Sequence, residues 1–166
     1  MYGYKEIEKM RLAAIKKLND AGIKCTVLTK GLLPGSLANY SKDNEYGITF
    51  ISLDESYRER VEPGAAPYNE RLAALKALHN QGCKTWVSVE PYPTPNLIKQ
   101  DLNAILEAIS FADKIIFGRT NYSKEISSYT QHKQFYNEQA TMVIKFCKER
   151  KIAYHIKKGT MTEEKR

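Results

Sequence analysis

The hydrophobic positions of the chain follow two alternating patterns. In residues 5–21 they recur every three or four residues, which predicts an amphipathic helix. The same spacing predicts three more helices, over residues 70–80, 97–112 and 131–150. Asn96 stands where it would cap the third of these four helices.

Short apolar and β-branched runs separate the helices and predict strands. They lie at residues 24–29, 47–52, 85–90, 114–118 and 152–156. Strands that alternate with helices indicate βαβ units and a parallel sheet. The remaining segment, residues 31–46, is rich in Gly, Pro, Ser and Asn and predicts a loop with little helix.

One helix-to-strand connection is used twice. The run from Leu18 to Lys24 is echoed by the run from Leu78 to Lys84. In both, a helix is followed by a glycine, then two residues, then a strand. Gly22 and Gly82 therefore stand where a helix end in the left-handed conformation needs glycine.

About five strands are too few for a closed eight-stranded barrel, which needs about 250 residues. The choices are a doubly wound open sheet or an incomplete barrel. We expect one domain over residues 1–158 and a flexible tail of basic and acidic residues at 159–166. In either architecture, ligands bind at the carboxyl ends of the strands.

Composition narrows the class of protein. The chain has 166 residues, of which 42% are hydrophobic, enough for one sizeable core. It contains no apolar run long enough for a membrane span, and its N-terminus lacks the apolar core of a signal peptide. The three cysteines lie 58 and 64 residues apart. That spacing is not a disulfide framework or a local metal site, so we expect a cytoplasmic protein.

The net charge of +7 is concentrated near the C-terminus. Such a balance favours acidic partners, such as phosphates, nucleotides or nucleic acid, although a solvated basic face would give the same pattern. The basic residues there are Lys148, Arg150, Lys151, Lys157, Lys158, Lys165 and Arg166.

Polar side chains follow the predicted strands and would meet at one rim of the sheet. The alternative is that strand ends are polar because loops are hydrated. No phosphate-binding glycine loop, nucleophile elbow or histidine-based metal spacing competes with this rim. In chain order the candidates are Lys30, Ser52, Asp54, Glu90, Arg119, Asn121, His155 and Lys157.

Glu90 stands out because a strand precedes it and Pro91 follows it, so stiff backbone holds it on both sides. Its carboxylate could accept hydrogen bonds from an amine or a ribose hydroxyl. A structural ion pair with Arg119 on the adjacent predicted strand is the alternative.

Several motifs extend this picture. The first is a strand that ends in Thr29-Lys30. The later motifs are, in order, Ile48-Thr49-Phe50-Ile51-Ser52-Leu53-Asp54, Arg60-Val61-Glu62-Pro63-Gly64-Ala65 and Arg71-Leu72. Over roughly residues 23–120 this order resembles radical S-adenosylmethionine (SAM) proteins, and among them the spore photoproduct lyase-like branch.

The resemblance implies an incomplete (βα)6 barrel that holds SAM beside a four-iron, four-sulfur cluster. Lys30 and Ser52 match the branch's SAM-contacting pair, and Asp54, Glu90, Arg119 and Asn121 are expected on the same rim. In an intact parent enzyme, the implied reaction is reductive cleavage of SAM to a 5′-deoxyadenosyl radical. The resemblance does not identify the substrate.

The family's Cys-x-x-x-Cys-x-x-Cys motif is absent from this sequence. Without three closely placed thiolates the cluster has no usual ligands, so we expect the chain not to be catalytic as given. It would be a fragment or a truncated gene product, or else a remnant that binds a nucleotide-like ligand; the first two are favoured. An unfinished barrel edge also predicts a homodimer. The alternative function is a non-catalytic binding module for nucleic acid or another acidic partner.

Overall fold

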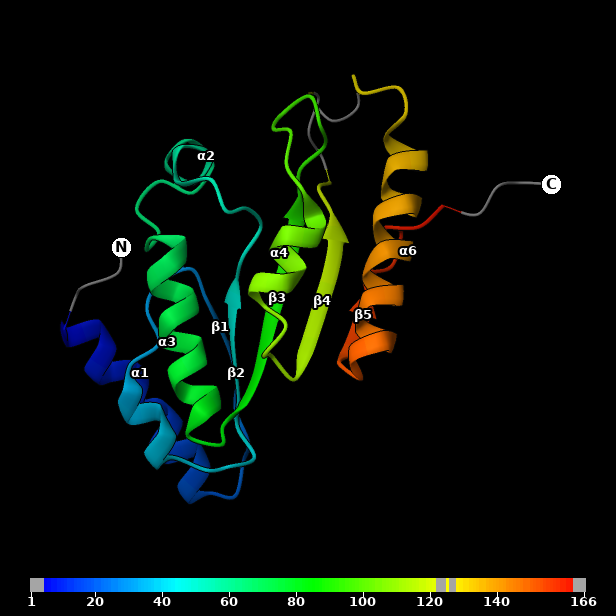
Figure 1. The fold of residues 1–166 in the computed structure, drawn as a ribbon. Helices are drawn as coiled ribbons and strands as arrows, with labels where there is room; N and C mark the ends of the chain where they lie inside the picture. Colours follow the sequence, from blue (N-terminus) through cyan, green and yellow to red (C-terminus); the bar gives the residue numbers. More distant parts are fainter. Residues whose placement is uncertain (1–4, 122–124, 126–127, 163–166) are drawn as a thin grey trace. The chain divides into compact units, whose positions relative to one another are not determined.

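The computed structural model describes residues 5–121, 125 and 128–162. Within them, five α-helices, one 3₁₀-helix and five strands follow one another along the chain (Figure 1). In order they are α1 (Lys5–Asp20), β1 (Thr26–Thr29), η1 (Gly35–Asn39), β2 (Glu45–Thr49), α2 (Glu55–Val61), α3 (Tyr68–Asn80), β3 (Lys84–Tyr92), α4 (Leu102–Ala108), β4 (Lys114–Arg119), α6 (His132–Arg150) and β5 (Ala153–Ile156).

The strands form one open sheet in the order β1-β2-β3-β4-β5. β1 pairs in parallel with β2, with Thr26 opposite Glu45. β4 pairs in parallel with β5, with Lys114 opposite Ala153. Because each pair runs in the same direction, helical crossovers connect the strands. The predicted α/β class with a mainly parallel sheet is confirmed.

The chain groups into two compact units. Unit 1 contains residues 1–49 and 54–86, and unit 2 contains residues 50–53 and 87–166. Each has an apolar core: Tyr46, Ile48, Tyr68, Leu75 and Leu78 in unit 1, and Phe50, Val89, Ile105, Phe117, Tyr136 and Val143 in unit 2. One domain over residues 1–158 stays a prediction.

The repeated helix-to-strand connection is built as its sequence predicts. Gly22 has φ +74° and Gly82 has φ +75°. After α1, Ile23 N donates to Leu18 O at 2.9 Å, and after α3, Cys83 N donates to Leu78 O at 3.1 Å. This is the Schellman arrangement, in which glycine avoids the steric cost of a left-handed residue.

The end of α6 has the same arrangement without a glycine. Lys151 has φ +58°, and Ile152 N donates to Cys147 O at 2.9 Å. A side chain in this conformation costs roughly 1–2 kcal/mol. We therefore expect Lys151→Gly to raise the free energy of unfolding by about 1 kcal/mol, measured by urea denaturation and circular dichroism.

The matched control is Gly82→Ala, because a β-carbon at Gly82 would meet no atom within 4 Å. Only the conformational cost acts there, and a loss of about 1 kcal/mol is expected. If Lys151→Gly were neutral or destabilising, the left-handed conformation of Lys151 would not be costly.

Two segments differ from the sequence prediction. α2 was not predicted, whereas η1 is a short helix within the segment predicted as a loop with little helix. The helix predicted over residues 97–112 is shorter, α4, and begins after Asp101, whose carboxylate accepts from Asn103 N at 2.8 Å. Asn96 does not cap it; the Asn96 side chain instead donates to Glu125 O at 2.7 Å.

Hydrogen bonds within unit 2 hold part of the predicted tail. Thr160 is buried, and its hydroxyl accepts from Arg119 N at 3.3 Å. Thr162 exchanges two hydrogen bonds with the side chain of Asn137, at 2.8 and 3.0 Å. Residues 163–166 lie outside the described residues.

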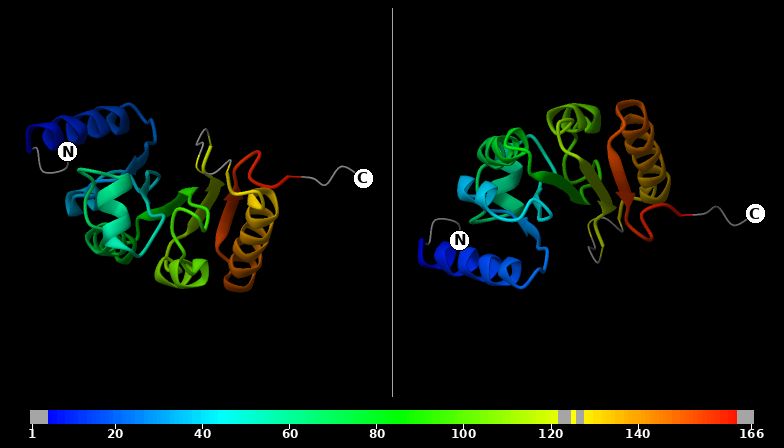
Figure 2. Two further views of the ribbon diagram at one scale, coloured as in Figure 1. Left: turned by 90° about the horizontal axis from the view of Figure 1, so that it is seen from above. Right: turned by 90° about the horizontal axis from the view of Figure 1, so that it is seen from below.

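α1 has an apolar face that the described residues do not bury. None of its residues is buried, and Met10 is 72% exposed. Figure 2 shows α1 and α3 on opposite sides of β1, in which Leu28 is also exposed. Self-association through this region stays a prediction. None of the described helices combines the length and hydropathy of a membrane span.

Candidate ligand-binding site

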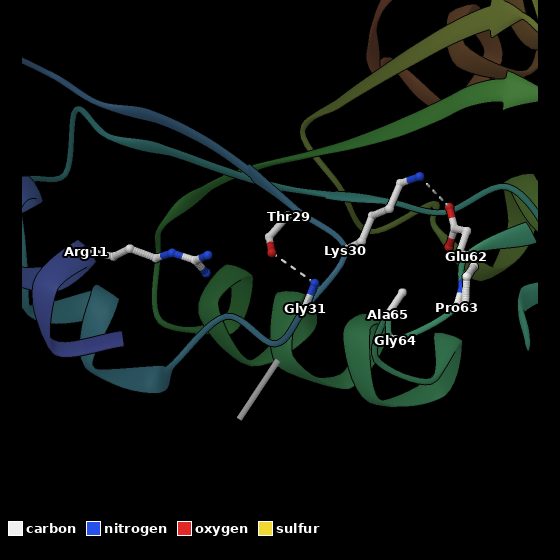
Figure 3. A pocket seen from close by; sticks show the side chains of 8 residues that line it. All are labelled: Arg11, Thr29, Lys30, Gly31, Glu62, Pro63, Gly64 and Ala65. Carbon is white, nitrogen blue, oxygen red and sulfur yellow. Dashed lines mark hydrogen bonds and ion pairs between the residues drawn. The ribbon is translucent and has the colours of Figure 1, made fainter. Parts of the chain in front are cut away.

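A pocket opens at the carboxyl end of β1 within unit 1, with a volume of about 360 Å³ (Figure 3). Three parts of the unit contribute: the end of β1 with the two residues after it, the loop after α2, and one side chain of α1. The lining residues are Arg11, Thr29, Lys30, Gly31, Glu62, Pro63, Gly64 and Ala65.

Backbone hydrogen bonds fix the loop after α2 beside β1. Glu62 N donates to Arg58 O at 2.7 Å and ends the helix. Ala65 N donates to Glu62 O at 3.0 Å, closing a turn in which Gly64 has φ +78°. Ala66 N donates to Lys30 O at 2.9 Å. The Glu-Pro-Gly-Ala sequence therefore forms a tight turn that holds Glu62 against the strand end.

Under this loop lies a buried ion pair. Arg71 Nη2 donates to Glu62 Oε2 at 2.8 Å, and both side chains are at most 1% exposed. Arg71 also donates to Ala66 O at 2.7 Å and Thr49 O at 2.9 Å, and it stacks on the ring of Tyr68. The guanidinium thus joins α3, the end of β2 and the loop.

The other oxygen of Glu62 faces Lys30. Lys30 Nζ lies 3.1 Å from Glu62 Oε1, and the Lys30 side chain is 48% exposed. Each oxygen of the Glu62 carboxylate therefore faces a cation, Oε1 the ammonium of Lys30 and Oε2 the guanidinium of Arg71. In Figure 3 the amine of Lys30 points at Glu62, and the guanidinium of Arg11 extends into the pocket from the opposite side.

The charges around the pocket do not balance. Lys30, Arg11 and the buried Arg71 supply three positive charges against the single negative charge of Glu62. Two of the cations are exposed and can meet a ligand, and a surplus of positive charge in a concave surface attracts anions. The pocket is therefore suited to a ligand that carries a carboxylate.

Of the sequence candidates, Lys30 lines this pocket. Ser52 is fully buried and belongs to unit 2. Asp54 caps α2: its Oδ1 accepts from Ser56 N at 2.8 Å and Tyr57 N at 3.1 Å. The hydroxyl of Ser56 and the Tyr57 amide, as hydrogen-bond donors to the carboxylate, lower the pKa of Asp54. Its observed contacts are those of a helix cap, and a ligand role stays a prediction.

The other candidates lie in unit 2. Glu90 forms an ion pair with Lys157, whose Nζ lies 3.5 Å from Glu90 Oε2, in place of the pair with Arg119 weighed from the sequence. A β-carbon on Gly118 would lie 2.7 Å from the Glu90 carboxyl carbon, so only glycine lets this side chain lie across β4. Arg119 Nε donates to Asn121 Oδ1 at 2.8 Å, which brings these two candidates together.

Sequence reasoning gave no role to Glu62 and Arg71, although both lie in the quoted motifs. Arg71 reads as one more polar residue of an amphipathic helix, and Glu62 reads as a loop residue. The one indication in the sequence was the Pro63-Gly64 turn directly after Glu62, because a stiff turn there restricts where the Glu62 side chain can lie.

The residues present do not fit an iron–sulfur cluster. No group of three or more His, Cys, Asp or Glu able to hold a metal occurs in the described part of the chain. Cys83 and Cys147 are buried and Cys25 is half-buried. Burial raises the pKa of the Cys147 thiol to about 11, and a protonated thiol is a poor metal ligand.

Comparisons with known proteins show similarity to parts of longer chains. No known family profile matches. The uncharacterized protein ORF301 of Acidianus two-tailed virus is 28% identical over 99 residues, which are 57% of this chain and 33% of ORF301. Streptococcus suis SuiB, solved bound to S-adenosylmethionine, superposes with a TM-score of 0.61 at 16% identity over 88% of this chain and 33% of SuiB. SuiB bound to its precursor peptide SuiA gives 0.58 at 19% identity, over 88% of this chain and 34% of SuiB.

The likeness to the two SuiB structures is one of fold. The SuiB structures have the partial-barrel fold of the radical SAM proteins, which agrees with the incomplete barrel predicted from the sequence. The chain spans about one third of the length of ORF301 and of SuiB. The likeness extends to the radical SAM fold in general and does not distinguish the spore photoproduct lyase-like branch.

Proposed function

We propose that this chain supplies the SAM-binding part of a radical SAM-type domain. The observation that carries the proposal is the pocket at the carboxyl end of β1, where Lys30 lies beside the buried Glu62. Support comes from the fold, which matches that of a protein solved with SAM bound, and from the Lys30 match in the family resemblance. The Arg-Val-Glu-Pro-Gly-Ala run supports the spore photoproduct lyase-like branch.

The pocket residues fit one end of SAM. SAM carries an adenosyl group and the zwitterionic amino-acid end of methionine, both attached to one sulfonium sulfur. Lys30 would hold the carboxylate through a charge-assisted contact, with Arg11 as a second cation on the same face. Thr29 would keep the backbone in place, because its hydroxyl accepts from Gly31 N at 2.9 Å.

The proposal includes Ser52, which matches the family resemblance, and four residues expected on the same rim because they follow predicted strands: Asp54, Glu90, Arg119 and Asn121. Since the cluster does not fit the residues described, we assign this chain binding of SAM and derive no cleavage step. Reductive cleavage is proposed only for a longer parent protein that carries the cluster.

Nucleic-acid binding is not adopted, because two of the C-terminal cations already pair with acids: Arg150 with Glu107 and Lys157 with Glu90.

Removing the charge of Lys30 tests this function. Lys30→Gln is expected to weaken SAM binding about tenfold or more, because a hydrogen bond to a charged group contributes about 1.5–3 kcal/mol. Titration calorimetry on the whole chain measures the dissociation constant. Lys17→Gln, which removes an equal charge from an exposed position on α1, is the control and should change it less than twofold. Equal affinities of wild type and Lys30→Gln would contradict the proposal.

A further inference from the structure

Helix α1 has an apolar face that the described part of unit 1 does not cover. We propose that this face packs against α1 of a second copy of the chain, with the two helices antiparallel about a two-fold axis near Leu12. The contact lies on a helix face, whereas the homodimer predicted from the sequence uses the open edge of the barrel. It is independent of SAM binding, so the two proposals can fail separately.

α1 has two apolar faces, and one of them lies against the described part of unit 1. On that face Leu12, Ile15 and Asn19 follow one another at helical spacing and are half-buried. The Asn19 side chain fixes the face, because it donates to Asn44 Oδ1 at 3.0 Å and accepts from Ser41 N at 3.2 Å. α1 therefore cannot turn its other face inward without breaking these hydrogen bonds.

The other face is a stripe of four apolar residues that runs along the helix. Its members are three or four residues apart, so they share one side of α1. They are Ile7, which is 39% exposed, Met10 at 72%, Leu18 at 42%, and the exposed Ala14. Apolar residues at this spacing form the seam along which two helices pack. A second copy offers the same stripe, and packing the two together removes both from water.

The charges beside this stripe favour an antiparallel arrangement. Glu6 and Lys17 are both exposed and lie on the same border of the stripe, since the eleven residues between their positions make about three turns of helix. The adjacent Lys16 is instead paired with Asp20 at 2.7 Å. In an antiparallel pair centred near Leu12, Glu6 of each copy would lie opposite Lys17 of the other. A parallel pair would place like charges together.

The apolar residues have the same symmetry. With the same centre, Ile7 of one copy would lie opposite Leu18 of the other, and the large Met10 would lie opposite the small Ala14. Arg11, on the other border of the stripe, extends into the pocket at the end of β1 (Figure 3) and is not part of the pairing. One helix packed on one helix is a small interface, so we expect a dimer that dissociates on dilution.

Met10→Glu tests whether the stripe is the interface, because it places a charge in the middle of the seam. Sedimentation velocity of the whole chain should give a dimer for the wild type and a monomer for the variant, both at about 100 µM. The circular dichroism spectrum should not change, since Met10 is mostly exposed. A wild-type chain that is monomeric at this concentration would overturn the proposal, including one that binds anionic lipid vesicles through α1 instead.

Two charge reversals test the antiparallel arrangement. Glu6→Lys and Lys17→Glu should each raise the dissociation constant of the dimer about tenfold, because each turns two attractive pairs into repulsive ones. An equimolar mixture of the two variants should regain the wild-type affinity, since opposite charges then face each other again. Lys9→Glu, an exposed position away from the stripe, is the control and should change the constant less than twofold. A mixture no tighter than either variant alone would overturn the arrangement.

Discussion

Replacement of Arg71 by leucine is expected to lower the free energy of unfolding by about 3–5 kcal/mol. The guanidinium is fully buried and is the partner of an equally buried carboxylate, Glu62. Its loss leaves that buried charge with only the half-exposed Lys30 as a partner, and it removes the donor that binds the carbonyl oxygens of Thr49 and Ala66. Urea denaturation followed by fluorescence measures the effect, because Trp86, the single tryptophan of the chain, lies in the same unit.

A double variant and a control separate the ion pair from other effects. Arg71→Leu combined with Glu62→Leu should lose less than the sum of the two single changes, since neither charge is then buried alone. Arg11→Leu removes an exposed guanidinium from the same pocket and should change stability by no more than about 0.5 kcal/mol. A loss below about 1 kcal/mol for Arg71→Leu would show that the buried pair does not hold this loop.

Gly47→Ala is expected to cost about 1–3 kcal/mol, because it forces a methyl group into a filled space. An ideal β-carbon at this position of β2 would lie 2.4 Å from Cε2 of the buried Trp86. The obstacle is a rigid ring rather than the end of a flexible chain, so β2 or the indole has to shift. Urea denaturation monitored by circular dichroism provides the measurement.

Gly35→Ala provides the matched control, since a β-carbon there would meet no atom within 4 Å and the backbone is not left-handed. It should be neutral within about 0.5 kcal/mol. Combining Gly47→Ala with Trp86→Leu should cost less than the two changes added together, because the smaller side chain leaves room. Equal stability of Gly47→Ala and Gly35→Ala would contradict the close packing.

The sequence predicted those parts of the fold that repeat a periodic pattern. All five strands occur near their predicted positions, and α1, α3 and α6 match their predicted helices closely. The two glycines that end helices have the required left-handed conformation. These features are local, because side-chain periodicity and backbone conformation decide them without long-range contacts.

Features that depend on tertiary contacts were not predictable in this way. α2 is only seven residues long, and its cap, Asp54, was interpreted as a ligand-binding residue at a strand end. A polar side chain after a strand can serve either purpose, and only the positions of Ser56 and Tyr57 show which contact forms. α4 is shorter than predicted because the helical spacing of hydrophobic residues extends over residues 97–112, whereas the helix itself contains only Leu102–Ala108.

The site was predictable in part for the same reason. Lys30 was identified from its place after β1, and it does line a pocket there. Glu62, its partner, comes from a loop 32 positions further along the chain. Neither spacing nor composition indicates that its carboxylate is buried against Arg71, because that contact depends on how α3 packs.

The central claim is that SAM binds in the pocket at the end of β1, and chemical-shift mapping tests it most directly. A ¹⁵N-labelled chain is titrated with SAM while its backbone amides are followed by nuclear magnetic resonance. Binding at this site should shift the amides of residues 29–31 and 62, 64 and 65 together and saturably, with Lys30→Gln abolishing the shifts at the same SAM concentration. Shifts confined to other parts of the chain, or no shifts at millimolar SAM, would contradict the claim.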